Sequence, residues 1–193
     1  LYPVRSKAEL LFRITFGFCV VLFIQSCDLF RTRMPEEPEV VSSRFVPATE
    51  PSLVFENMKN AFTDKNVVNY IKSFSDSTYI FVPSPGAQSL SGVLFLHWTV
   101  DEEEQYFSNL CTKAPPTLEW LSLKEESRNV SSVQYEVTYR ISGLPSRATA
   151  EGKSQMLLQL TSSQIWVIVR WSDYESTTSG TISWSTVKAT YIQ

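Results

Sequence analysis

The stretch Val133–Ile141, with the sequence VQYEVTYRI, alternates throughout between apolar or aromatic residues and polar residues. A period of two separates the side chains of a strand onto two faces, and this pattern is typical of an antiparallel strand with one buried face. The short segments Ser127–Asn129 and Ser142–Pro145, on either side of the stretch, are typical of hairpin loops. The sequence therefore predicts a central strand of an antiparallel sheet.

Further strands are predicted on both sides of this one, and helices are predicted before them. We expect strands near residues 78–82, 118–125, 148–161 and 165–174. Apolar residues at helical spacing predict a helix from about residue 52 to Asp64-Lys65-Asn66 and a second helix with Asn66 as its N-cap. Helices followed by a meander of long strands indicate an α+β fold.

A third helix, over residues 101–111, begins with the run Asp101-Glu102-Glu103-Glu104. Acidic residues in a first turn suit the helix dipole. Consecutive positions on a helix point in different directions, so we expect these acids to face water and not to bind a metal together.

The N-terminal region has the layout of a secretory signal. Residues 14–24 (ITFGFCVVLFI) form an uncharged apolar run of 11, and the basic residues Arg5, Lys7 and Arg13 precede it. A run of this length fits the apolar core of a signal peptide, whereas a membrane-spanning helix needs about 20 residues.

The four residues that follow, Ile24-Gln25-Ser26-Cys27, resemble the lipobox of bacterial lipoproteins. Gln25 departs from that pattern, which prefers Ala, Ser or Thr. The resemblance implies removal of residues 1–26 as a signal peptide and acylation of Cys27, which would attach the chain to a membrane of the bacterial cell envelope, facing the periplasm or the surface.

Residues 27–51 are interpreted as a disordered tether between Cys27 and a folded domain over 52–193. The segment from Asp28 to Pro51 holds four of the ten prolines and is rich in glutamate. It cannot bury enough apolar surface to offset the entropy of ordering. We expect its last residues, Phe45 and Val46 among them, to pack on the domain edge.

Charge and composition exclude several classes of function. The first 26 residues hold three basic residues and one acidic residue, so that 14 basic and 19 acidic residues remain, a net charge of −5. Nucleic acid is therefore not an expected partner. With His97 as the single histidine and no recognisable motif, we expect neither a metal site nor a cofactor.

The order of elements from Ser52 to Tyr191 resembles the nuclear transport factor 2-like superfamily, which includes the SnoaL-like proteins. The likeness depends on the turn Asp64–Asn66, a second helix that reaches Phe74-Ser75-Asp76, and the strand Trp166–Asp173. It implies a cystatin-like cone, with the N-terminal helices packed in a curved antiparallel sheet and often a pocket at the open end. Members include enzymes and proteins without known chemistry, so the fold leaves the function open.

Three residues are the candidate ligand-binding residues of such a pocket: Tyr139, Trp171 and Asp173. Alternation along the last strand places Val167 and Val169 on the same face as Trp171 and Asp173. A carboxyl group in an apolar pocket has a raised pKa and could transfer protons, which makes Asp173 a candidate catalytic residue. His97 is the other candidate, although we expect a partly buried, hydrogen-bonded side chain there.

The favoured hypothesis is a non-enzymatic, membrane-anchored envelope lipoprotein that binds a small apolar ligand or a partner protein. The alternative is a pocket enzyme of the isomerase or dehydratase type that uses Asp173 or His97, and it requires two polar groups that converge in one cavity. A third hypothesis is a subunit of an envelope complex, which would show a broad apolar patch on the outer face of the sheet.

Overall fold

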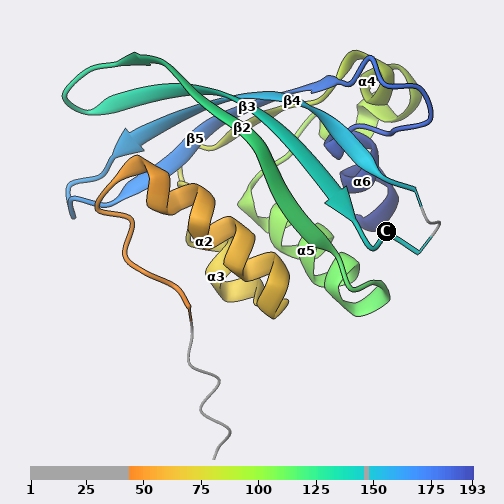
Figure 1. Cartoon of the computed structure of the whole chain (residues 1–193), viewed down its shortest axis with the longest axis horizontal. Helices are drawn as coiled ribbons and strands as arrows, with labels where there is room; N and C mark the ends of the chain where they lie inside the picture. Colours follow the sequence, from red (N-terminus) through yellow and green to blue (C-terminus); the bar gives the residue numbers. More distant parts are fainter. Residues whose placement is uncertain (1–43, 146–147) are drawn as a thin grey trace, which may run out of the picture. The chain divides into compact units, whose positions relative to one another are not determined.

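The computed structural model describes residues 44–145 and 148–193. The expected signal peptide, most of the tether and Cys27 lie outside the described residues. The strands are β1 (Ile80–Val82), β2 (Thr117–Arg128), β3 (Ser132–Ser142), β4 (Ala150–Leu160) and β5 (Trp166–Glu175). They form one sheet in the order β1-β5-β4-β3-β2, in which β1 runs parallel to β5 and the other neighbours are antiparallel (Figure 1).

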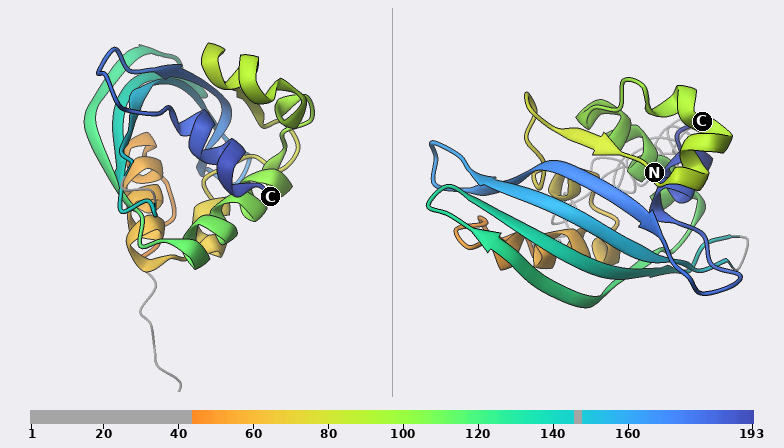
Figure 2. Two further views of the ribbon diagram at one scale, coloured as in Figure 1. Left: turned by 90° about the vertical axis from the view of Figure 1, so that its right-hand side faces the viewer. Right: turned by 90° about the horizontal axis from the view of Figure 1, so that it is seen from above.

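The helices are α2 (Pro51–Asp64), α3 (Val67–Ile71), α4 (Pro85–Ser91), the 3₁₀ helix η2 (Gly92–Phe95), α5 (Val100–Lys113) and α6 (Trp184–Tyr191). The sheet curves, and α2, α5 and α6 lie on its concave side (Figure 2). This arrangement confirms the predicted α+β fold and the cystatin-like cone. Within the described ranges, no helix has the length and apolar character needed to cross a membrane.

Local sequence signals account for the helix boundaries. Lys65 has a left-handed backbone (φ 52°) that ends α2, and the Asn66 side chain accepts a hydrogen bond from the Asn69 backbone N–H at 3.0 Å, as predicted. Thr99 and Glu102 form a capping box at the start of α5. The sequence did not predict α4, η2 or α6, because these segments are short and lack a sustained apolar period.

β5 contains a bulge at Val169, which changes the predicted faces of this strand. Ile168 and Arg170 pair with consecutive residues of β4, so that Val169 has no partner in the register. An extra residue shifts the alternation of side chains by one. The prediction that Val167 and Val169 share the inner face is therefore wrong. The residues of β5 whose partners on β4 face the helices are Trp166, Ile168, Trp171 and Asp173.

The residues just before α2 pack on the edge of the domain, as expected for Phe45 and Val46. The backbone of Val46 exchanges hydrogen bonds of 3.0 and 2.6 Å with the Asn57 side chain on α2. The Trp166 N–H donates to the carbonyl oxygen of Ala48 at 2.8 Å. These contacts join the chain that enters the domain to both α2 and β5.

The outer face of the sheet carries ion pairs across β2, β3 and β4, while Ile80 on β1 and Tyr174 on β5 are exposed apolar residues. Arg140 on β3 pairs with Glu119 on β2 and with Glu151 on β4, and Lys153 pairs with Glu136 in the next row. Exposed ion pairs of this kind stabilise little but keep a sheet face hydrated. The broad apolar patch that the envelope-complex hypothesis requires is not found on this part of the described sheet.

Candidate functional site

The interior of the cone, between the concave face of the sheet and helices α5 and α6, contains two buried polar clusters. The first surrounds Glu103 of α5, whose side chain is 0% exposed. Its carboxylate forms an ion pair with Lys188 of α6. It also accepts hydrogen bonds from three neutral donors: the hydroxyls of Tyr70 (3.0 Å) and Tyr79 (2.6 Å) and the indole N–H of Trp98 (2.8 Å).

Lys188 lies in an aromatic cage and is also 0% exposed. Its ammonium nitrogen is 3.7 Å from the ring centroid of Phe81 and 4.1 Å from that of Trp171, with Trp98 and Tyr106 within 5.8 Å. Cation–π attraction of this kind strengthens when water is excluded. Burial lowers the pKa of Lys188 to about 8, while the Glu103 carboxylate acts in the opposite direction.

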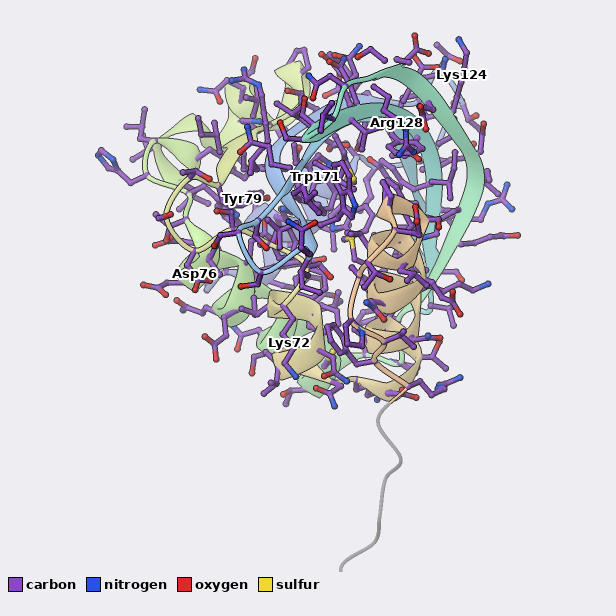
Figure 3. All side chains as sticks on the ribbon, turned by 90° about the vertical axis from the view of Figure 1, so that its left-hand side faces the viewer. Lys72, Asp76, Tyr79, Lys124, Arg128 and Trp171 are labelled. Carbon is purple, nitrogen blue, oxygen red and sulfur yellow. The ribbon has the colours of Figure 1, made fainter. Side chains whose placement is uncertain are left out.

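Tyr70 and Tyr79, which donate to Glu103, and the neighbouring Tyr106 stay neutral. Burial and the nearby charge of Glu103 raise the pKa values of Tyr70, Tyr79 and Tyr106 well above the ordinary value. Tyr79 and Trp171 are buried, and in the view of Figure 3 they lie within the outline of the domain, whereas the exposed Lys124 lies at its rim. The Glu103 carboxylate is therefore held by three neutral groups in addition to its counter-ion.

The second cluster surrounds Asp173 at the end of β5, which is 1% exposed. One carboxylate oxygen accepts hydrogen bonds from the Ser185 backbone N–H (2.8 Å) and hydroxyl (2.6 Å). The other accepts from the hydroxyls of Tyr139 (2.8 Å) and Ser154 (3.1 Å). Burial raises the pKa of Asp173, and the bonds from Ser185, Tyr139 and Ser154 oppose that shift.

The donors to Asp173 are themselves fixed by further contacts. The Tyr139 hydroxyl accepts a hydrogen bond from the backbone N–H of Trp184 at 2.7 Å, and the Ser154 hydroxyl accepts one from the indole N–H of Trp171 at 2.9 Å. Gly152 makes room for this arrangement, because a Cβ at that position would lie 2.5 Å from the Tyr139 hydroxyl oxygen. Burial, and then the charge of Asp173, raise the pKa of Tyr139. The cluster is therefore closed, with donors and acceptors matched within the protein.

Helix α6 supplies groups to both clusters. Ser183 caps the helix by accepting a hydrogen bond from the Thr186 N–H at 3.2 Å. From this start, Trp184, Ser185 and Lys188 all point into the cone, and each is 0% exposed. The Trp184 indole donates to the Tyr106 hydroxyl at 2.9 Å and its ring packs edge-on against Trp171. The space in which a ligand would lie in an open cone is thus occupied by α6.

The structure brings three of the predicted site residues together. Asp173 and Tyr139 share a hydrogen bond, and Trp171 joins them through Ser154. All three are shielded from solvent. His97 is exposed, so the expectation of a partly buried histidine is wrong, and the Asp173 cluster contains no atom of His97.

Sequence reasoning missed Glu103 and Lys188. Glu103 was expected to face water, yet it precedes Tyr106, Phe107 and Leu110 by three, four and seven positions and therefore shares their helix face. Lys188 lies four residues after Trp184 and three before Tyr191 on α6. On α5, an apolar helical period interrupted by one charged residue was the signal that could have found Glu103, whereas α6 is too short for the same signal to identify Lys188.

The arrangement offers little that could act on a substrate. A general acid or base has to reach the proton that it transfers, and these carboxylates bond only to groups of the protein that enclose them. Over the described ranges, no group of three or more His, Cys, Asp or Glu side chains is placed to hold a metal ion. The geometry is that of a polar core that stabilises the closed cone.

Comparisons with known proteins identify the fold. No protein-family model matches the sequence, and no curated protein matches it. Among solved structures, a protein of unknown function from Mycobacterium tuberculosis matches with a TM-score of 0.53 and 7% identity, over 73% of this chain and 83% of the other. A protein with a cystatin-like fold from Caulobacter vibrioides matches with a TM-score of 0.51 and 11% identity, over 65% of this chain and 87% of the other.

A third structure, an NTF2-like protein of unknown function in nutrient uptake from Rhodospirillum rubrum, matches with a TM-score of 0.51 and 9% identity. The match covers 66% of this chain and 98% of the other. Identities this low are evidence for the shape of the backbone alone. The described domain therefore has the NTF2-like, cystatin-like fold.

Proposed function

We propose that this chain is a membrane-anchored, non-enzymatic envelope lipoprotein whose folded domain binds a partner protein through its outer surface. The lipid would be carried by Cys27, as the lipobox-like sequence implies. One observation supports the binding mode above the others: α6 fills the interior of the cone. Because α6 fills the inside of the cone, we expect a partner to be recognised by the exterior of the described domain.

Opening the interior to a ligand would be unfavourable. Withdrawal of α6 would remove the counter-ion of Glu103 and two donors of Asp173 at once. Each buried polar group left without a partner costs about 1–3 kcal/mol, and a buried charge costs more. A small apolar ligand would also have to displace Trp184, which is fully buried. These terms favour a partner protein over a ligand inside the cone.

The exterior carries an apolar surface that supports this proposal. Leu90 on α4, Val93 on η2 and the following Leu96 are 84%, 82% and 65% exposed. The segment from Pro83 to Trp98 contains no Asp, Glu, Lys or Arg. Large apolar side chains that gather on a surface often mark contacts with other proteins.

The anchor is tested by mass spectrometry of the chain expressed with residues 1–26 in a bacterium. We expect a mature chain that begins at Cys27 and carries the mass of acyl groups, and a Cys27→Ser variant that is neither acylated nor retained in the membrane fraction. Cys19→Ser, within the apolar run, is the matched control and should be acylated normally. An unmodified chain that still fractionates with membranes would contradict the anchor.

The binding mode is tested by photo-crosslinking in cells. A photoreactive residue at Leu90 or Val93 should give a discrete protein adduct, whereas the same residue at Lys124 on the outer sheet should not. Native mass spectrometry of the purified chain distinguishes the alternative. A small molecule that copurifies with the chain at one to one would favour a ligand in the interior over a partner protein.

A further inference from the structure

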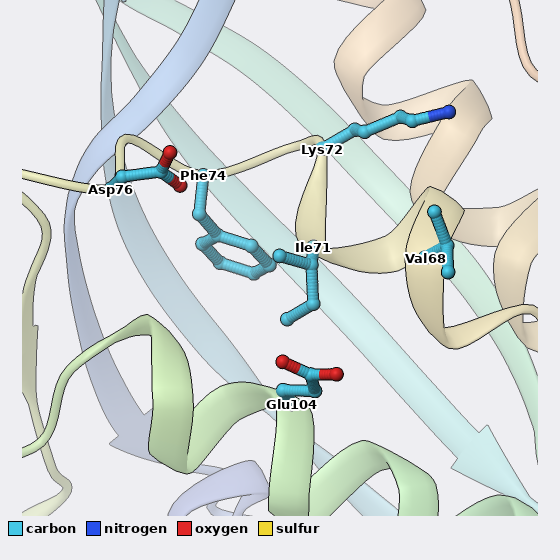
Figure 4. Close-up of a pocket in the computed structure, with 6 residues that line it drawn as sticks. All are labelled: Val68, Ile71, Lys72, Phe74, Asp76 and Glu104. Atoms are coloured by element: carbon cyan, nitrogen blue, oxygen red, sulfur yellow. The ribbon is translucent and has the colours of Figure 1, made fainter.

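A surface hollow of about 440 Å³ lies between α3, α5 and the segment that follows α3 (Figure 4). It lies outside the buried clusters described above. Its lining residues are Val68, Ile71, Lys72, Phe74, Asp76 and Glu104. Residues from two helices and a connecting segment therefore meet around one concave site.

The floor of the hollow is apolar. Phe74 is 3% exposed and belongs to the core, and Ile71 at the end of α3 is half-buried. Val68 is 66% exposed, which leaves most of its side chain in contact with water. An occupant with an apolar portion would remove this surface from water.

Two carboxylates face the hollow from different elements. Asp76 follows α3 and Glu104 lies on α5, and both side chains are exposed. Among the described residues, neither forms a hydrogen bond or an ion pair. Figure 4 shows both groups directed toward the space beside Phe74 and Ile71.

Lys72 does not neutralise these carboxylates. Its ammonium group lies over the ring of Phe45, 4.7 Å from the centroid, and is 3.4 Å from the side-chain oxygen of Asn69. In Figure 4 the Lys72 side chain extends away from Asp76 and Glu104. The hollow therefore presents negative charge beside an apolar floor.

This combination complements a cation on an apolar stem. The side chains of lysine and arginine have this form, because their methylene groups pack on apolar surface while the charged end stays near water and counter-charges. An anionic occupant would be repelled, and a hydrated metal ion would gain nothing from the floor. We infer that the hollow receives a lysine or arginine side chain of the partner protein, with its stem along Val68 and its charge between Asp76 and Glu104.

This inference rests on the proposed partner-binding function for the source of the cation. The hollow can be tested on the mature chain from residue 27, kept unlipidated by Cys27→Ser, by NMR titration of backbone amides. The probes are the peptide acetyl-Leu-Arg-Leu-amide, n-butylguanidinium, 1-pentanol and pentanoate. We expect the peptide to shift the amides of Val68, Ile71 and Glu104 in a saturable manner, and to bind at least about tenfold more tightly than butylguanidinium.

Variants separate the hollow from general electrostatics. Asp76→Asn with Glu104→Gln should weaken peptide binding at least about tenfold. Glu50→Gln with Glu56→Gln changes the net charge equally, at two exposed residues outside the hollow, and should leave binding unchanged. Val68→Ser should weaken binding by a smaller factor, because it removes apolar surface and no charge.

Three results would overturn the inference. The first is that 1-pentanol shifts the same backbone amides as much as the peptide does, and the second is that the two double variants weaken peptide binding equally. The third is that butylguanidinium binds as tightly as the peptide, which would identify a free cation as the ligand. None of them changes the acylation of Cys27 or the crosslinking at Leu90. Failure of the hollow and failure of the proposed function are therefore distinguishable.

Discussion

Glu103 and Glu104 are neighbours on α5, yet they lie in opposite environments. Glu103 is 0% exposed and is held by Lys188 and three neutral donors. Glu104 is exposed at the hollow and has no partner among the described residues. One step along a helix with 3.6 residues per turn rotates a side chain by about 100°. The comparison teaches that the helix face decides whether an acid stabilises the fold or remains available to another molecule.

The largest expected effect is that of Glu103→Ala. This change leaves the Lys188 ammonium buried without a counter-ion, and we expect a loss of about 3–5 kcal/mol in the free energy of unfolding, measured with urea. Glu104→Ala should change it by less than about 0.5 kcal/mol. If Glu103→Ala does not fold, the double variant Glu103→Gln with Lys188→Met, which removes both charges and keeps an acceptor oxygen for the Tyr70, Tyr79 and Trp98 donors, should recover a folded protein. Equal stabilities of the two alanine variants would remove the distinction between the two glutamates.

A smaller loss in the free energy of unfolding is expected for Ser185→Ala, at the cluster around Asp173. Ser185→Ala removes one hydroxyl donor to Asp173 and the acceptor of the Ser84 backbone N–H. Buried groups left unpaired in this way cost about 1–3 kcal/mol. Ser77→Ala, at an exposed position, is the control and should be neutral by thermal or urea unfolding. A neutral Ser185→Ala variant would mean that water replaces the lost hydroxyl and that the interior is less closed than described.

Buried charge also predicts a pH dependence. The pKa of Lys188 is lowered to about 8 in the folded protein, against about 10.4 for an unperturbed lysine. Between these values the unfolded chain binds more protons than the folded protein, so the free energy of unfolding should rise with pH, on the order of 3 kcal/mol. Above about pH 10 the buried tyrosines, whose pKa values are raised, should reverse the trend.

The measurement is urea unfolding at several pH values from about 7 to 12. Lys188→Met should lose the rise between about pH 8 and 10 and keep the fall at higher pH. A rise of the same size in Lys188→Met would show that another group titrates in this range.

The smallest changes in the free energy of unfolding are expected for two other acids of α5, Glu102 and Glu104. Glu102 accepts from the Thr99 backbone N–H at 2.7 Å, so Glu102→Ala should cost about 0.5–1 kcal/mol through loss of the cap. Glu104→Gln should lie within about 0.5 kcal/mol of the parent protein or stabilise it slightly, since it removes charge near Asp76. If Glu104→Gln costs more than Glu102→Ala in urea unfolding, then Glu104 has a structural partner.

Local patterns predicted most of the framework. The alternation in Val133–Ile141 was confirmed, because all five apolar positions of that stretch are buried. Asn66 was confirmed as a cap, because capping depends on only a few consecutive residues. The third predicted helix was confirmed over Val100–Lys113, because its acidic first turn and its apolar spacing are also local features of the sequence.

The parts that were missed depend on contacts between distant residues. The bulge at Val169 is defined by the register with β4 and leaves no mark in the local period. The burial of Glu103 depends on Lys188 and Tyr70, and the hollow depends on Asp76 and Glu104, which are 28 positions apart. One sequence shows residue types and spacings, but it does not show which helix closes the cone.

The closure of the cone by α6 also constrains the order in which the domain can fold. Lys188 and Glu103 are 85 positions apart in the chain, and Ser185 and Ser84 are 101 apart. A helix of eight residues is not stable alone in water, so α6 forms when it docks. We therefore expect the sheet and α5 to assemble before α6 docks, and the water around Glu103 and Asp173 to be expelled late in folding. Long-range closure of this kind favours a slow folding rate, on a time scale of milliseconds or longer.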